Sequence, residues 1–175
     1  MHYRSPGDPA IAIYLLHERF KSHSSYYYPY IQALPPPLSA WTMTSTAKSA
    51  LPDDLANRAV ALSRVVDLEY DALKNTTTNS GASLPVWLTR DGYRWAQSLV
   101  ISRAFEPGQP GTAKVLLPGI DFLNHGADAL LGPFWDHEAN AAEFYADRDF
   151  YPGDEVFSCY GGGRGHWWLT HGFAG

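Results

Sequence analysis

Arg103 stands at a position where the surrounding sequence favours an apolar side chain. It follows Trp95 by eight residues and Leu99 by four, so a helix would place all three on one otherwise apolar stripe. A guanidinium buried on such a stripe needs a carboxylate or a carbonyl group as its partner. Alternatively, the side chain extends into solvent at the end of the helix, where a cation is also favoured. Taken alone, Arg103 favours this second interpretation.

Polar residues also stand at the ends of two apolar segments. Asn124 and His125 directly follow the apolar stretch 120–123, and a strand end of this kind would bring hydrogen-bond donors and acceptors together. Asn and Gly are equally typical of a simple turn. Tyr160 closes an alternating segment just before the glycines 161–163, so its phenol could hydrogen-bond a reacting centre. The alternative is a core tyrosine, because the chain has 11 tyrosines.

The C-terminal third lacks the spacing of several other kinds of site. The glycine-rich stretch 161–165 has no Lys-Ser/Thr pair, as a phosphate-binding loop requires, and no Gly-x-Ser-x-Gly esterase motif occurs. The histidines of this region are scattered rather than convergent, so we predict no metal site. These histidines are His125, His137, His166 and His171.

Length and composition limit the class of protein. With 175 residues, 45% of them hydrophobic and 18% charged, the chain is expected to form one globular domain, or one domain with a helical extension. It has no apolar run of about 20 residues, the length that spans a bilayer. Cys159 is its one cysteine and the N-terminus lacks a secretory pattern. We therefore expect an intracellular protein, cytoplasmic or nuclear, with an organelle as a further option.

Charge is distributed unevenly along the chain. Residues 1–114 carry 11 Lys and Arg against 9 Asp and Glu, whereas residues 115–175 carry 2 against 9, which is a net charge of -7. An acidic segment repels phosphate backbones, so we expect no nucleic-acid partner. It suits a basic ligand, such as a lysine-bearing protein or a cationic cofactor, although ordinary solvated surface would look the same.

The first half of the sequence predicts helices. Asp8 and Pro9 are typical of a helix start, and Ile13, Leu16 and Phe20 would share one face of that helix. A long helix is predicted from about residue 52, with a strongly amphipathic face. That face comprises Leu55, Ala59, Leu62, Val66, Tyr70 and Leu73. The polar stretch 75–83 predicts an exposed loop, and Thr89 is a good cap for a helix running to about residue 105.

The remainder predicts short strands, which gives an α+β fold class. Strands are expected at 115–117, 143–148 and 155–160, and a short helix at 167–172. Pro152 and Gly153 stand where a type II turn needs them, so the last two strands are predicted to form a hairpin.

Several of these segments, in this order, resemble the SET-domain protein methyltransferases. The similar stretches are 102–105, 117–125, 151–161 and 172–173, and the resemblance extends over about residues 10–175. The most similar branch contains the Rubisco lysine methyltransferases and the actin-histidine methyltransferase. The resemblance implies a SET-like fold with short strands, a knot-like C-terminal motif and a large helical insert. It also implies an N-terminal tail at 1–9, the insert at 10–83 and the C-terminal part of the SET domain at 84–175.

The resemblance also implies roles for individual residues. Tyr160 corresponds to the catalytic tyrosine, and Arg103, Asn124 and His125 correspond to contacts of the cofactor S-adenosylmethionine. Phe105 and Phe173 correspond to walls of the substrate channel, and an apolar Phe105 suits the aliphatic stem of a lysine. The implied function is therefore a protein-lysine N-methyltransferase acting on a lysine-bearing protein, without a metal and without a membrane or nucleic-acid partner.

The sequence also departs from the family pattern. No Gly-x-Gly segment precedes residue 10, and the helical substrate-binding domain of this branch has no counterpart before Gly175. These departures predict a truncated or degenerate copy and leave its enzymatic activity open. The alternative is a non-catalytic, SET-derived protein-binding module. A third interpretation is an unrelated α+β protein with metal-dependent hydrolase activity. The sequence specifies neither the substrate protein nor the oligomeric state.

Overall fold

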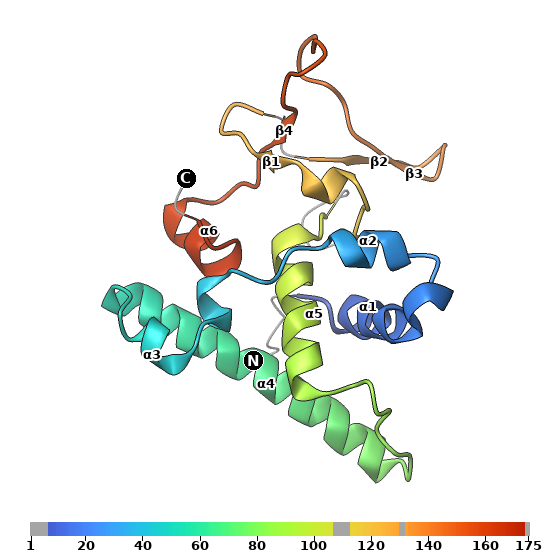
Figure 1. The fold of residues 1–175 in the computed structure, drawn as a ribbon, viewed down its shortest axis with the longest axis vertical. Coiled ribbons are helices and arrows are strands. Elements are labelled where there is room, and N and C mark those ends of the chain that lie inside the picture. Colours follow the sequence, from blue (N-terminus) through green and yellow to red (C-terminus); the bar gives the residue numbers. More distant parts are fainter. Residues whose placement is uncertain (1–6, 107–112, 130–131, 174–175) are drawn as a thin grey trace. The chain divides into compact units, whose positions relative to one another are not determined.

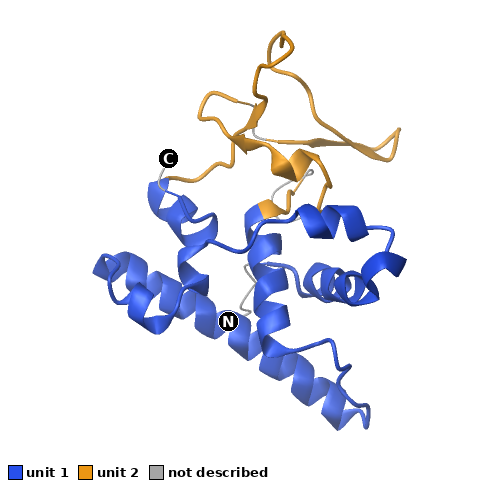
Figure 2. Cartoon of the chain, viewed as in Figure 1, with its two compact units in different colours: residues 1–102, 164–174 blue, residues 103–163, 175 orange. Residues whose placement is uncertain are grey.

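The chain passes from a helical unit into a smaller unit with short strands, and then returns. The computed structural model describes residues 7–106, 113–129 and 132–173. Residues 1–102 and 164–174 belong to the helical unit, and residues 103–163 to the strand-containing unit (Figure 2). Most of the predicted N-terminal tail 1–9 lies outside the described residues. The predicted ranges 1–9, 10–83 and 84–175 follow the family resemblance rather than the contacts that define the two units. These ranges stay a prediction.

The helical unit is built around α4 and α5, which cross each other (Figure 1). Among the described residues of this unit, two 3-10 helices and several short α-helices connect the larger elements. Its helices are α1 (Pro9–Lys21), α2 (Tyr28–Ala33), α3 (Ser45–Lys48), α4 (Asp53–Asn79), α5 (Arg90–Arg103) and α6 (Arg164–Thr170), with 3-10 helices η1 (Ser22–Ser24) and η2 (Ala40–Thr42).

Two predicted helix starts are confirmed in atomic detail. The Asp8 carboxylate accepts hydrogen bonds from the backbone N–H groups of Ala10 and Ile11, at 2.9 and 3.1 Å, and Pro9 occupies the first position of α1. The Thr89 hydroxyl accepts from the N–H of Gly92 at 3.1 Å. Both caps satisfy backbone donors that the first turn of a helix leaves without internal partners.

The predicted helix faces are confirmed for α4 and only partly for α1. Ala59, Val66 and Tyr70 are buried on α4, as the periodicity predicts. The buried residues of α1 are Ala12, Leu15, Leu16 and Glu18. Of the three residues expected on one face, only Leu16 is buried, and Phe20 is 58% exposed. Phe20 stands in the last turn of α1, where the helix no longer packs against a neighbour that covers this side chain.

The loop predicted at 75–83 was wrong for residues 75–79, because α4 continues to Asn79. The hydroxyls of Thr77 and Thr78 donate to the carbonyls of Leu73 and Lys74, one turn back, at 2.9 Å each. These polar residues therefore satisfy their hydroxyls without leaving the helix. The helix ends only before Gly81, which has a φ of +77°.

Ion pairs tie α4 to α5. Arg94 donates through two nitrogens to the two carboxylate oxygens of Asp67, at 2.8 and 2.5 Å, and Arg90 donates to Asp71 at 2.5 Å. The fully buried Tyr93 packs against Tyr70 with the ring centroids 6.0 Å apart. Planar guanidinium groups in two-point contact with a carboxylate fix geometry as well as charge. This contact sets how α5, which carries Arg103 at its end, lies on α4.

The described residues of the second unit include four very short strands. β1 (Asn124–His125) pairs in parallel with β4 (Phe157–Ser158), and β2 (Phe134–Asp136) pairs antiparallel with β3 (Ala141–Glu143). A 3-10 helix, η3 (Ile120–Phe122), leads into β1. The α+β class is confirmed, because helices and small sheets occur together.

The predicted hairpin between 143–148 and 155–160 was wrong. The turn at 151–154 does form, with Gly153 at a φ of +99° and the Asp154 N–H bonded to the Tyr151 carbonyl at 3.0 Å. It does not join paired strands, however. β3 pairs with the preceding β2, because the Asp136 carboxylate accepts from the N–H groups of Glu138 and Ala139 and stabilises a turn there. β4 is thereby left to pair with β1.

The strand predicted at 115–117 reduces to one bridge. Val115 and Phe105 exchange two backbone hydrogen bonds of 2.9 Å, and residues 116–117 form no strand. Within the part of the chain that the structure describes, no helix is both long enough and apolar enough to cross a membrane.

We predict that Asp67→Asn lowers the free energy of unfolding at neutral pH by about 1–2 kcal/mol, because Arg94 loses a charged partner. Burial raises the pKa of the Asp67 carboxyl, but the Arg94 and Arg90 contacts outweigh burial and leave this pKa below its usual range. A carboxyl whose folded-state pKa is depressed stabilises the protein above its unfolded pKa and loses that effect as the pH falls through the folded value.

The difference between the two proteins should therefore narrow below about pH 4, the usual pKa of an Asp carboxyl. Denaturant unfolding at several pH values measures it, with the exposed Asp128→Asn as control. A difference that stays the same from neutral pH to acid would contradict this role of Asp67.

We also predict that Gly126→Ala disrupts the β1–β4 pairing. A Cβ atom at Gly126 would lie 2.7 Å from the Cβ of Phe157, which cannot swing away because it is attached to the backbone. Overpacking of this kind costs about 1–3 kcal/mol. Gly163→Ala is the matched control, because no atom lies within 4 Å of its added Cβ. Equal unfolding midpoints for both variants would show that the strands do not approach this closely.

Candidate functional site

The parallel pairing of β1 with β4 brings together polar residues that are far apart in the sequence. Asn124 lies opposite Phe157, and His125 lies opposite Ser158. Parallel strands require a long connection, which here contains β2, β3 and the turn at 151–154. Tyr160 stands two residues after the end of β4 and contacts the chain around β1. We call this region the β1–β4 site and define it as Arg103, Asp121, residues 123–125, Glu155 and Tyr160.

Tyr160 is fixed by two hydrogen bonds to the chain around β1. Its phenol donates to the carbonyl of Leu123 at 2.6 Å, and its backbone N–H donates to Nδ1 of His125 at 3.2 Å. The centroids of the His125 and Tyr160 rings lie 5.4 Å apart. The structure therefore brings the predicted catalytic tyrosine next to the predicted Asn–His pair.

Burial governs the ionisation of the Tyr160 phenol, and the Tyr160 N–H selects the tautomer of a neutral His125 ring. The half-buried position of the Tyr160 phenol raises its pKa, while Arg103 acts to lower it and Asp121 to raise it further. The phenol is therefore neutral at physiological pH, and its proton is directed at Leu123. Since Nδ1 of His125 accepts a hydrogen bond, the neutral ring carries its proton on Nε2.

Arg103 has both kinds of partner that a buried guanidinium needs. Its Nη1 donates to the backbone carbonyl of Asp121 at 2.7 Å and lies 3.7 Å from the Oδ2 of the same residue. The guanidinium carbon also lies 5.5 Å from the centroid of the Phe122 ring. The side chain is 17% exposed, so the interpretation of Arg103 as a fully solvated helix-end cation was wrong.

Asn124 is bonded across the strand crossing. Its side-chain amide donates to Oε1 of Glu155 at 2.6 Å, and both residues are exposed. This bond joins β1 to the segment that enters β4. It also places a carboxylate at the exposed edge of the β1–β4 site.

The two predicted channel residues belong to different units, and each is described within its own. Phe105 forms the bridge to Val115, and its ring lies close to the backbone of Gly132, where a Cβ atom would be 3.2 Å from Cδ1 of the ring. Phe173 stacks on Trp167 with centroids 5.9 Å apart, and its ring lies 6.1 Å from that of His171. Their role as channel walls stays a prediction.

Sequence reasoning missed Asp121 and Glu155 as members of the site. Asp121 had a detectable signal, because a carboxylate within the otherwise apolar stretch 120–123 implies burial against a cation. Arg103 was the matching cation, but its partner could not be chosen among the many acidic residues of this region. Glu155 is one of several exposed acidic residues, so nothing in the sequence set it apart.

No metal site emerges from the described residues. In the ranges 7–106, 113–129 and 132–173, no group of three or more His, Cys, Asp and Glu side chains converges on one point. Burial and the nearby Arg58 lower the pKa of His166, which keeps this ring neutral, and its neighbour His171 is bonded to Thr170.

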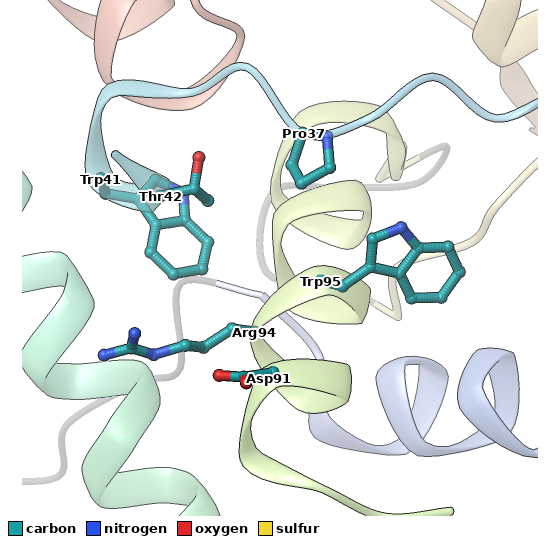
Figure 3. Close-up of a pocket in the computed structure, with 6 residues that line it drawn as sticks. All are labelled: Pro37, Trp41, Thr42, Asp91, Arg94 and Trp95. Carbon is teal, nitrogen blue, oxygen red and sulfur yellow. The ribbon is translucent and has the colours of Figure 1, made fainter. Parts of the chain in front are cut away.

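A separate cavity of about 210 Å³ lies within the helical unit. Figure 3 shows Arg94 extending from α5 to the side where Trp41 lies, whereas Trp95 extends to the other side. Arg94 is neutralised by Asp67, and Trp95 carries the guanidinium of Arg19 at 4.1 Å from its ring centroid. The residues lining this cavity therefore offer packing rather than a juxtaposed acid, base or nucleophile. They are Pro37, Trp41, Thr42, Asp91, Arg94 and Trp95.

The β1–β4 site presents charged groups of both signs. Arg103 offers a guanidinium, Asp121 and Glu155 offer carboxylates, and Tyr160 offers a neutral phenol oxygen whose own proton is already donated. None of these groups is arranged as a nucleophile next to a base. The chemistry that fits is orientation of a ligand and stabilisation of an electron-poor group.

Comparison with known proteins places the fold. No protein-family model and no curated protein matches the chain. It is similar to the structure of Rubisco LSMT bound to AdoMet, with a TM-score of 0.76 and 22% identity, over 94% of this chain and 38% of that one.

Two structures of the SET domain of LSMT are also similar. The one bound to lysine and AdoHcy has a TM-score of 0.76 and 21% identity, over 94% of this chain and 40% of that one. The one bound to MeLysine and AdoHcy has a TM-score of 0.67 and 20% identity, over 94% and 39%. The chain thus spans about two fifths of the length of these structures, and what it shares with them is a SET-like fold.

Proposed function

We propose that this chain forms part of an S-adenosylmethionine-dependent protein-lysine N-methyltransferase of the SET type. The observation that carries the proposal is the fixed position of Tyr160, bonded to Leu123 and His125 within a SET-like fold. The similar structures hold AdoMet, or lysine or methyllysine with AdoHcy, which supports both the cofactor and the substrate class. The proposal includes the finer assignment to the Rubisco-methyltransferase branch. It also includes an intracellular site of action, because a chain with the single cysteine Cys159 has no disulfide framework of the kind that secreted proteins use.

The side chains present fit the cofactor. S-adenosylmethionine carries a carboxylate, an ammonium group and a sulfonium, and when bound it supplies an electron-poor methyl group. Arg103 would hold the carboxylate, because a guanidinium is the preferred partner of that group. Asn124 and His125 would contribute the polar contacts beside it, with Nε2–H of His125 as a donor.

Tyr160 would act as an acceptor rather than as a base. Its proton is donated to Leu123 and its pKa is raised by burial, so its oxygen remains that of a neutral phenol. Such an oxygen accepts weak C–H···O contacts from an electron-poor methyl group. Tyr160 and nearby carbonyls would in this way hold the methyl group in line with the attacking nitrogen.

The substrate amine must be neutral to react, and burial of a lysine favours the neutral form. Phe105 would contact the aliphatic stem of that lysine and exclude water, and the same role for Phe173 rests on the family resemblance alone. Residues 103–163 carry 3 Lys and Arg against 10 Asp and Glu, so this unit attracts a basic protein surface. The lysine ammonium would lose one proton to water before it reacts. Its nitrogen lone pair would then bond to the methyl carbon as the carbon–sulfur bond breaks, which leaves a neutral thioether and a methylated ammonium.

A second candidate is a non-catalytic, SET-derived protein-binding module. It is favoured by the engagement of Arg103 with Asp121 and of Asn124 with Glu155, since both proposed cofactor contacts have partners within the chain. Titration calorimetry with S-adenosylmethionine separates the two functions. An enzyme binds with a Kd on the order of micromolar, or about -8 kcal/mol, whereas a module gives no binding heat.

We predict that Tyr160→Phe lowers the rate of methyl transfer about tenfold or more, since losing about 1.4 kcal/mol of transition-state stabilisation has that effect. The assay follows a labelled methyl group from S-adenosylmethionine onto a panel of lysine-bearing proteins. Tyr151→Phe is the matched control, because Tyr151 is 75% exposed in the same unit. If Tyr160→Phe transfers methyl groups at the wild-type rate, the phenol takes no part in the reaction and the proposed role of Tyr160 is wrong.

A further inference from the structure

Asp121 is a buried carboxylate that the proposed mechanism does not use. We propose that it is a positioning residue, which holds the guanidinium of Arg103 in the orientation in which that group meets the cofactor carboxylate. This inference rests on the proposed function and adds a residue to it. Its basis is the geometry of Arg103, Asp121 and the turn η3.

Arg103 is anchored to Asp121 at two points. One Nη1 atom donates to the Asp121 backbone carbonyl at 2.7 Å and lies 3.7 Å from its Oδ2. Because the guanidinium is planar and rigid, fixing Nη1 restricts where Nη2 and Nε point. The Phe122 ring, 5.5 Å from the guanidinium carbon, further limits the tilt of this plane.

The carboxylate has separate partners for its two oxygens. Oδ1 accepts from the backbone N–H of Gly119 at 3.2 Å and so shapes the turn that leads into η3. Oδ2 is the oxygen near Arg103. An asparagine at position 121 can keep the bond to Gly119 through its own oxygen, but it removes the charge next to Arg103. The two roles of Asp121 can therefore be tested apart.

Because both side chains are largely buried, the loss of either one strongly affects the other. The Asp121 side chain is completely buried and that of Arg103 is 17% exposed. Removing one member of such a pair leaves the other charge uncompensated in a poorly solvated place. In Asp121→Asn the side-chain amide would also present a donor to a group that has only donors. Arg103 would then turn toward solvent and away from the β1–β4 site.

Asp121 also balances the field of Arg103 at Tyr160. Arg103 acts to lower the pKa of the Tyr160 phenol, and Asp121 acts to raise it. In Asp121→Asn the phenol would lose the effect of the carboxylate and, because Arg103 turns away, that of the guanidinium as well. The two groups therefore act on Tyr160 as a pair.

The test uses the full chain and titration calorimetry with S-adenosylmethionine. Asp121→Asn should raise the Kd about tenfold, and the exposed Asp128→Asn should leave it unchanged. In an Arg103→Met background, Asp121→Asn should have no further effect on the Kd. A parallel denaturant series measures the factor by which Asp121→Asn increases the unfolding equilibrium constant. This factor should be about tenfold smaller in the Arg103→Met background than in the wild-type background.

The outcomes separate this inference from the proposed function. If the wild-type chain does not bind S-adenosylmethionine, the proposed function fails and the inference fails with it. If wild type binds and Asp121→Asn binds equally well or more tightly, the inference alone is overturned. It is also overturned if Asp121→Asn weakens binding equally with and without Arg103.

A second variant covers the case in which Asp121→Asn does not fold. Arg103→Lys retains the charge but lacks the planar fork that Asp121 would hold in place. It should also raise the Kd about tenfold, and an unchanged Kd would contradict the claim that the orientation of this group matters.

Discussion

The crossing of two distant segments at β1 and β4 is the constraint on which the candidate site depends. Each strand has only two residues, so the sheet itself supplies few hydrogen bonds. Side chains provide the rest, through the bonds of Tyr160 to Leu123 and His125 and of Asn124 to Glu155. The residues that would perform the chemistry are therefore also the residues that hold the crossing together.

The charged side chains of the site are paired where they are buried. The second unit is strongly acidic, yet Arg103 lies partly buried in it beside the carboxylate of Asp121. A lone cation there would pay a large desolvation cost, and the pairing offsets it. The neighbouring phenol stays neutral under the opposing fields of both groups and of its own burial. The site thus combines a fixed cation with an uncharged acceptor, which suits the carboxylate and the electron-poor methyl group of the proposed cofactor.

Local sequence signals predicted the helices well and the strand pairing poorly. Caps at Asp8 and Thr89 and the apolar face of α4 were readable, because they depend on residues a few positions apart. The hairpin failed because a favourable turn at 151–154 does not decide which strands pair. The partners of Arg103, Asn124 and Tyr160 lie 18, 31 and 37 residues away. Only the order of motifs suggested that these residues meet, and it could not identify Asp121 or Glu155.

The central claim is that the Tyr160 phenol oxygen meets the methyl group that is transferred. Proton NMR of S-adenosylmethionine labelled with ¹³C in its methyl group, bound to the chain, tests it directly, because a C–H···O contact deshields the methyl protons. We predict a downfield shift in the wild-type complex that is largely lost in Tyr160→Phe. The same methyl shift in both complexes would contradict the claim.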